Sequence, residues 1–176
     1  MNSEIRPQKV IRMPEIVAEI SANHNGSLDR ALEIVSAVAE TGATAVKLQT
    51  YTADTITLDS DGSAFKIPQE QKLWGGRRLY DLYEEAHTPW EWHRPIFQHA
   101  QNLGLDYFST PFDESAVDFL EQLSVSRYKV ASIEIVDIPL IEKIASTGKP
   151  IILSTGASTY EDVSDALAAI RRIGDN

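Results

Sequence analysis

The sequence predicts an α/β fold in which helices cover a parallel sheet. Short apolar segments alternate with longer segments whose apolar residues recur at helical spacing. Polar side chains collect directly after the apolar segments, where parallel α/β sheets bind their ligands. The chain has 176 residues, 43% hydrophobic and 24% charged, which is the size and composition of one globular domain.

Charge and cysteine content exclude several classes of function. Sixteen basic and 26 acidic residues give a net charge of −10, so we expect no nucleic-acid partner and no binding to an anionic membrane. The sequence has no cysteine, which removes disulfides and thiolate sites and fits a cytoplasmic protein. No apolar run reaches about 18 residues, and the first residues lack the apolar core of a secretory signal.

The first βα unit follows a polar arm, residues 1–14, that contains two prolines. Residues 15–20 (EIVAEI) form a short apolar run, which predicts a strand. Apolar residues from Ser27 to Thr41 fall at helical spacing, which predicts a helix. Ser27 or Asn25 can cap its start, and Gly42 follows its end.

The second unit contains the longest connection of the chain. Residues 45–49 (AVKLQ) predict a strand, whereas residues 51–76 have no clean period. A segment of this length predicts a functional loop, because most connections are much shorter. Helices are predicted at 79–86 and 89–102, the second with proline at its first position.

Three shorter units complete the alternation. Their predicted strands are residues 105–109, 128–132 and 150–154, and their predicted helices are residues 114–123, 139–146 and 159–172. A βα order repeated five times predicts five parallel strands.

Polar residues recur at the carboxyl ends of all five predicted strands. They are Glu19, Lys47, Gln49, Thr110, Lys129, Ser132, Glu134 and Ser154. Lysines and hydroxyls together suit an anionic small molecule, because both donate hydrogen bonds to carboxylate or phosphate oxygens. The two glutamates add groups for acid–base chemistry.

Several of these residues have a simpler interpretation. Lys47 also fits a lysine that only pairs with Glu19 or reaches solvent, and Glu19 also fits a purely structural role. His24 most simply builds a turn. The other three histidines are six residues apart, unlike helical metal ligands at a spacing of four, so surface or packing roles are favoured.

Six motifs in order resemble the sialic acid synthase family. They are residues 16–20 (IVAEI), 23–26 (NHNG), 46–50 (VKLQT), 108–112 (FSTPF), 128–132 (YKVAS) and 152–156 (ILSTG). Within that family, residues 79–83 (LYDLY) and 88–93 (TPWEWH) resemble the pseudaminic branch more than the legionaminic and N-acetylneuraminic branches.

The resemblance implies a transferase reaction. These enzymes condense phosphoenolpyruvate with an open-chain amino-sugar aldehyde, releasing phosphate and a nine-carbon 2-keto acid. In the pseudaminic branch the sugar is a 2,4-diacetamido-2,4,6-trideoxy-altrose. A divalent metal, manganese or magnesium, acts as a Lewis acid. The resemblance also implies a homodimer.

The resemblance assigns roles to the same residues that the strand ends single out. It implies that phosphoenolpyruvate is held by Lys47, Thr110, Lys129, Ser132 and Ser154. Gln49 and Glu134 would line the sugar side, and Glu19 would be the catalytic acid–base residue.

The implied fold is a (β/α)8 barrel, which needs about 250 residues. We expect residues 15–176 to supply five of its βα units, without the last strands or the family's C-terminal antifreeze-like domain. The family's metal-ligating histidines lie on the later strands, so we expect no metal site and no activity in this chain alone. Two other hypotheses are a lyase in which Lys47 or Lys129 forms a Schiff base, and a non-catalytic half-barrel that binds an anionic small molecule.

Overall fold

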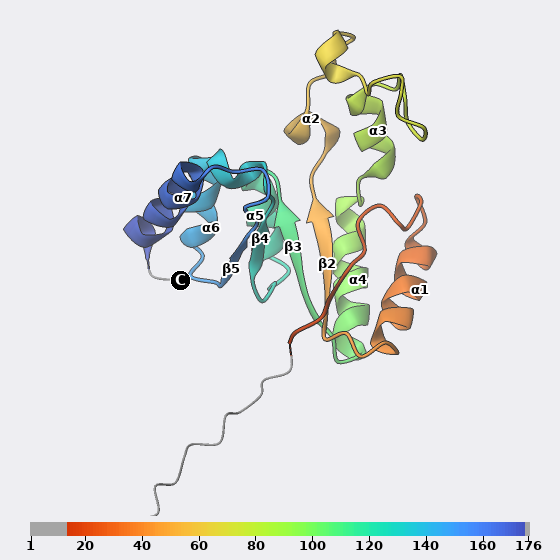
Figure 1. Cartoon of the computed structure of the whole chain (residues 1–176). Coiled ribbons are helices and arrows are strands. Elements are labelled where there is room, and N and C mark those ends of the chain that lie inside the picture. The colour runs from red at the N-terminus through yellow and green to blue at the C-terminus, as the bar shows by residue number, and fades with distance from the viewer. Residues whose placement is uncertain (1–13, 175–176) are drawn as a thin grey trace, which may run out of the picture.

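The computed structural model describes residues 14–174 and contains the five predicted βα units (Figure 1). The strands form one parallel sheet in the order β1-β2-β3-β4-β5. The predicted arm, residues 1–14, lies outside the described residues except for Pro14. In chain order the elements are β1 (Val17–Glu19), α1 (Leu28–Ala39), β2 (Ala45–Thr50), α2 (Ala53–Ile56), the 3₁₀ helix η1 (Ser63–Phe65), α3 (Leu79–Ala86), α4 (Trp90–Asn102), β3 (Asp106–Pro111), α5 (Glu114–Glu121), β4 (Tyr128–Val130), η2 (Glu134–Val136), α6 (Ile138–Ala145), β5 (Ile151–Leu153) and α7 (Tyr160–Ile173).

The predicted strands and helices are confirmed, with two corrections. β4 ends at Val130 rather than at Ser132, because the chain turns there into η2. The connection at 51–76 is partly ordered into α2 and η1, and Lys66 forms an isolated antiparallel bridge with Arg78. Short polar helices and single bridges of this kind leave no periodic signal in the sequence.

Local sequence explains where the helices begin. Ser27 caps α1 by accepting a hydrogen bond from the Arg30 N–H at 3.2 Å. Thr159 and Asp162 form a reciprocal capping box at the start of α7. The helices bury their apolar faces against the outer face of the sheet, and α1, for example, buries Ala31, Val35 and Val38.

Alternation along the strands separates two faces of the sheet. Val46 and Leu48 of β2 are fully buried and belong to the core beneath the helices. Lys47 and Gln49 point to the opposite, inner face. In register, Glu19 lies beside Lys47, and Gln49 lies beside Thr110. Figure 1 shows the sheet curling around this inner face, with α1 and α4 on one flank and α5, α6 and α7 on the other.

A charged cluster holds the amino-terminal edge of the curled sheet. Arg127, just before β4, donates to Glu15, just before β1, at 2.8 Å. It also donates to Asp106 at the start of β3 at 2.7 Å, and its guanidinium lies 4.6 Å from the centre of the Phe108 ring. Because the Arg127 guanidinium donates to it, the Glu15 carboxyl has a lowered pKa. One side chain thus joins the segments that begin β1, β3 and β4.

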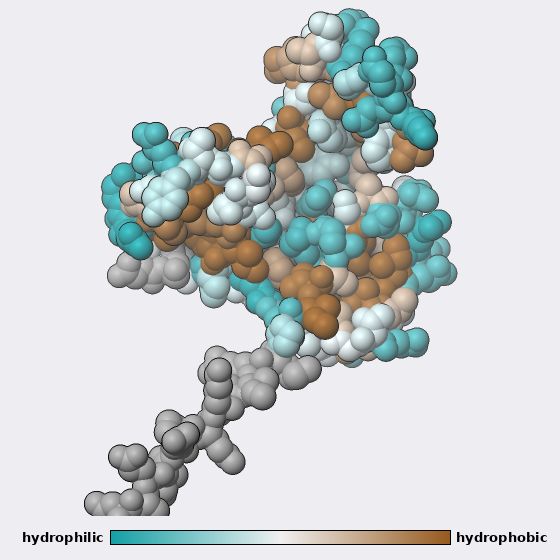
Figure 2. All heavy atoms as spheres, viewed as in Figure 1, coloured by the Kyte–Doolittle hydropathy of each residue, from teal (hydrophilic) through white to brown (hydrophobic). Residues whose placement is uncertain are grey.

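Apolar surface remains on the flank made by β5, α6 and α7 (Figure 2). Ile152, Leu167 and Ile173 are among the exposed large apolar residues there. Hydrophilic side chains instead gather over the segment that follows η1, at the top of the view. Within residues 14–174, no helix combines the length and the apolar character needed to cross a membrane.

We predict that Arg127→Met lowers the free energy of unfolding by about 1–3 kcal/mol, because two carboxylates lose their partner in a half-buried place. Arg172→Met is the matched control, since Arg172 pairs with Glu142 on the surface, and it should cost less than about 1 kcal/mol. Urea denaturation measures both. Equal losses in the two variants would contradict a special role for Arg127.

His93, in α4, is fully buried, and burial lowers its pKa to about 4. In the unfolded chain His93 has its ordinary pKa of 6.5, so between about pH 6.5 and pH 4 the unfolded state binds a proton there and the folded state does not. The contribution of His93 to the free energy of unfolding is therefore fully present above about pH 6.5, and it is lost as the pH falls toward the folded-state pKa.

We predict a loss of about 2 kcal/mol of unfolding free energy from this group between about pH 7.5 and about pH 5. Urea titrations of the parent and of His93→Gln at both pH values separate the effect of His93 from that of the acidic residues, because the acidic residues titrate in both proteins. The difference between the two pH values should be smaller in His93→Gln. The same difference in both proteins would show that His93 does not titrate as described.

Candidate functional site

The carboxyl ends of β1, β2 and β3 bring three predicted site residues into contact. Lys47 forms an ion pair with Glu19, its neighbour in register. Lys47 Nζ also donates to Thr110 Oγ1 at 3.2 Å. The ion pair with Glu19, which the sequence left open as a simpler role for Lys47, is therefore present. It lies on the inner face beside the Thr110 hydroxyl.

Lys129 provides a second cationic centre at the next strands. Its Nζ donates to Ser154 Oγ at 2.6 Å and to the Val130 carbonyl at 2.5 Å. Ser132 lies beyond the end of β4, where its Oγ accepts from the Ala157 N–H at 3.1 Å. A Cβ at Gly156 would lie 3.2 Å from that oxygen, so glycine permits this close approach.

Electrostatic coupling shows that these groups share one region. Burial, and next the nearby Lys47 ammonium, lower the pKa of Lys129, while Glu134 and Glu19 oppose the shift. Burial raises the pKa of Glu134, with Asp137 adding to the effect and Lys129 opposing it. Two lysines and two glutamates therefore influence one another across the inner face.

Ser21 is a residue of this region that the sequence analysis did not select. Its N–H donates to Glu19 Oε1 at 3.1 Å, and its hydroxyl donates to Gln49 Oε1 at 3.4 Å. It is also one of three non-glycine residues described with positive φ, at 46°. A serine two residues past a strand end carries no signal of such a turn, so only the structure reveals it.

A groove adjoins the site on the side of Ser21. It has a volume of about 450 Å³ and lies between the loop after β1 and helix α3. Its lining includes Asn23, Asn25, Trp74, Leu82 and Glu85. The mixture of amide, carboxylate and aromatic groups can accommodate a polar molecule with apolar parts.

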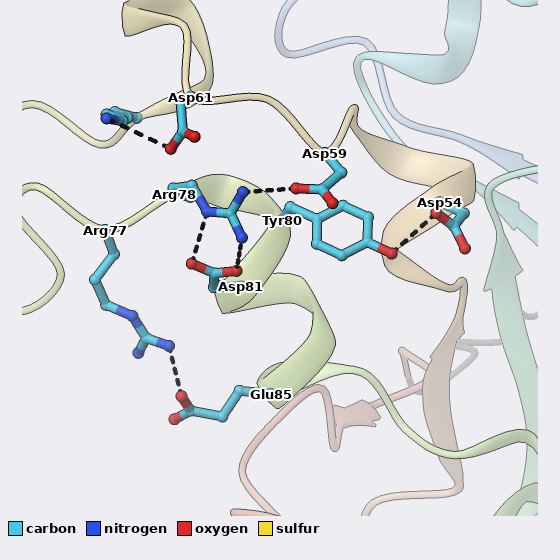
Figure 3. A network of polar contacts seen from close by, with 9 residues as sticks. Asp54, Asp59, Asp61, Arg77, Arg78, Tyr80, Asp81 and Glu85 are labelled. Carbon is cyan, nitrogen blue, oxygen red and sulfur yellow. Dashed lines mark hydrogen bonds and ion pairs between the residues drawn. The ribbon is translucent and has the colours of Figure 1, made fainter.

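The long connection after β2 is held above this region by ion pairs (Figure 3). Arg78 donates to Asp59 at 2.6 Å and, through two nitrogens, to Asp81. Tyr80 donates to Asp54 of α2 at 3.0 Å, which ties α2 to α3. The Arg78 guanidinium lowers the pKa of Asp81. The predicted functional loop is therefore an ordered segment over the strand ends.

The four histidines do not gather as metal ligands. His24 lies against Thr88, His93 against Thr50 and His99 against Ser36, and His87 contacts the Glu84 carbonyl. Residues 14–174 contain no group of three or more histidine, aspartate or glutamate side chains arranged to hold a metal ion. His24 also builds the predicted turn, because its Nδ1 accepts from the Gly26 N–H.

Comparisons with known proteins identify the family of the chain. The NeuB family matches residues 34–176, which is most of the chain. The chain belongs to the NeuB family. Pseudaminic acid synthase of Helicobacter pylori is 48% identical over 94% of this chain and 48% of its own length. Pseudaminic acid synthase of Campylobacter jejuni serotype O:2 is 48% identical over 84% of this chain and 43% of its own length.

A solved NeuB relative confirms the barrel-type fold. The N-acetylneuraminic acid synthetase structure from Leptospira borgpetersenii, in complex with citrate, has a TM-score of 0.73 and 26% identity, over 90% of this chain and 50% of that one. The five parallel βα units are thus a curled half of a (β/α)8 barrel. The chain spans about half the length of the curated relatives that it matches.

We predict that Lys129 loses its proton at a lower pH than an ordinary lysine does, because burial and Lys47 disfavour its charge. Trace acylation over a pH series, followed by mass spectrometry, measures the pH at which Lys129 is half deprotonated, which is its titration midpoint. Exposed Lys72 serves as the reference for reagent reactivity. The variant Lys47→Gln should move the Lys129 midpoint upward; an unmoved midpoint would mean that the two ammonium groups do not interact.

Proposed function

We propose that the protein is a phosphoenolpyruvate-condensing synthase that makes pseudaminic acid. The observation that carries the proposal is the pair of half-buried lysines on the inner face, each bonded to a hydroxyl at a neighbouring strand end. Two separated cations with hydroxyl partners suit a small molecule that has a phosphate at one end and a carboxylate at the other. Kinship with two pseudaminic acid synthases supports the choice of product.

The proposed reaction joins the methylene carbon (C3) of phosphoenolpyruvate to the aldehyde carbon of a 2,4-diacetamido-2,4,6-trideoxy-altrose. One water is consumed and inorganic phosphate leaves, so the product is a nine-carbon 2-keto acid. Such an addition needs fixed cations for the anionic substrate and a group that takes a proton from water and supplies one to the aldehyde oxygen.

Each predicted site residue has a role in this scheme. Phosphoenolpyruvate would be held by Lys47, Thr110, Lys129, Ser132 and Ser154. Gln49 and Glu134 would face the sugar. Glu19 would exchange protons with water or with the intermediate, and it lies in an ion pair with Lys47.

The divalent metal that the family resemblance implies stays a prediction. The described histidines already bond to hydroxyls or carbonyls, so residues 14–174 do not fit a metal centre. A homodimer and a cytoplasmic location also stay predictions for the full gene product.

A second candidate is a Schiff-base lyase that uses Lys129. Its lowered pKa favours the neutral amine that attacks a carbonyl. Borohydride reduction in the presence of pyruvate distinguishes the two candidates. The synthase forms no covalent adduct, whereas the lyase would leave a reduced pyruvate adduct on Lys129 in the mass spectrum.

We predict that Lys47→Ala in the full gene product weakens phosphoenolpyruvate binding more than sugar binding. Loss of one charge-assisted contact costs about 1.5–3 kcal/mol, or about tenfold to a hundredfold in affinity. Phosphate release measured against each substrate gives the two KM values. Lys66→Ala is the control, because Lys66 pairs with Asp61 on the surface. A raised sugar KM with an unchanged phosphoenolpyruvate KM would place Lys47 elsewhere.

A further inference from the structure

A path of buried polar side chains runs behind the candidate site. The described residues include six buried polar or charged side chains: His24, Thr50, Thr88, His93, Ser109 and Thr110. Thr110 bonds to Lys47 on the inner face, whereas the other five lie along one path. Burying several polar side chains in an otherwise apolar layer costs free energy unless each polar group is hydrogen-bonded.

The hydrogen-bond directions in the first half of the path follow from one carbonyl. His93 Nδ1 lies 3.3 Å from the Pro89 carbonyl oxygen, which can only accept, so Nδ1 carries the proton. Nε2 of the neutral ring must then accept, and Thr50 Oγ1 donates to it at 2.8 Å. The Thr50 hydroxyl has one proton, which it donates to His93, so Thr50 Oγ1 accepts from Ser109 Oγ at 2.7 Å.

The second half of the path uses the opposite tautomer. The Gly26 N–H donates to His24 Nδ1 at 3.1 Å, so His24 carries its proton on Nε2 and donates to Thr88 Oγ1 at 3.2 Å. Thr88 directly precedes Pro89, the acceptor for His93. Both histidines therefore meet at the short segment between α3 and α4.

The path lies directly behind two predicted binding residues. Thr50 follows Gln49 along β2, and Ser109 precedes Thr110 along β3, so their side chains point to opposite faces of the sheet. Gln49 and Thr110 are themselves partners in register. The bond between Thr50 and Ser109 thus joins the two strand ends at the level where Gln49 and Thr110 face the site.

We propose that Ser109, Thr50 and His93 are positioning residues: their one-way hydrogen-bond chain fixes the ends of β2 and β3 against α4 and so holds Gln49 and Thr110 in binding geometry. The inference rests on the proposed function for what Gln49 and Thr110 bind. It assigns specific protonation states to residues that make no contact with substrate themselves.

Kinetics of the full gene product test the positioning role. Thr50→Val removes the hydroxyl at nearly constant volume. We expect kcat/KM to fall about tenfold to a hundredfold, because Gln49 and Thr110 are then no longer held in position. Thr50→Ser restores the hydroxyl and should stay within about twofold of the parent. The control is Ser36→Ala, since Ser36 of α1 bonds to His99 of α4, away from the strand ends. Equal effects of Thr50→Val and Ser36→Ala would overturn the proposal.

A second measurement needs no activity. Ring ¹⁵N spectra should show His93 protonated on Nδ1 and His24 on Nε2. Amide hydrogen exchange at residues 47–50 and at Ser109 and Thr110 should quicken in Thr50→Val, or in Ser109→Ala if the valine variant does not fold, and not in Ser36→Ala. His93 protonated on Nε2, or unchanged exchange, would reject the path. The predicted spectra and exchange in a protein without synthase activity would uphold the path and reject the proposed function instead.

Discussion

Every residue of β2 must direct its side chain to one of two faces that require opposite chemistry. Val46 and Leu48 enter the layer beneath the helices, whereas Lys47 and Gln49 enter the inner face of the curled sheet. A slip of one residue in register would bury a lysine among apolar side chains and expose the leucine. The apolar core therefore fixes the register, and the register fixes which polar groups meet at the site.

The inner face is stabilised differently at its two edges. At the amino-terminal edge, Arg127 joins Glu15 and Asp106 and stacks on Phe108, so opposite charges meet. At the carboxyl edge, the half-buried lysines Lys47 and Lys129 repel each other, while Glu134 and Glu19 favour the charged form of Lys129. Ionisable groups that perturb one another in a half-buried place are typical of a functional site.

Much of this organisation could be predicted from the sequence. Apolar runs and helical spacing located the five strands and the main helices, and the polar residues after the strands located Glu19, Lys47, Thr110, Lys129 and Ser154 at one edge. The signals are local, because alternation, caps and strand ends are properties of a few neighbouring residues. Ser132 and Glu134 are predicted for the same edge, and the structure places them after β4 rather than in it.

Other features depend on contacts between distant segments, which no local pattern contains. His93 and Thr50 are 43 residues apart, yet their bond and burial set the protonation state of the ring. Arg78 and Asp59 order a connection that has no period in sequence. The order of the elements and the chemistry of the strand ends follow from local patterns in the sequence. Which polar groups share a buried environment depends on the folded arrangement, because desolvation and hydrogen-bond direction are set by what packs against each group.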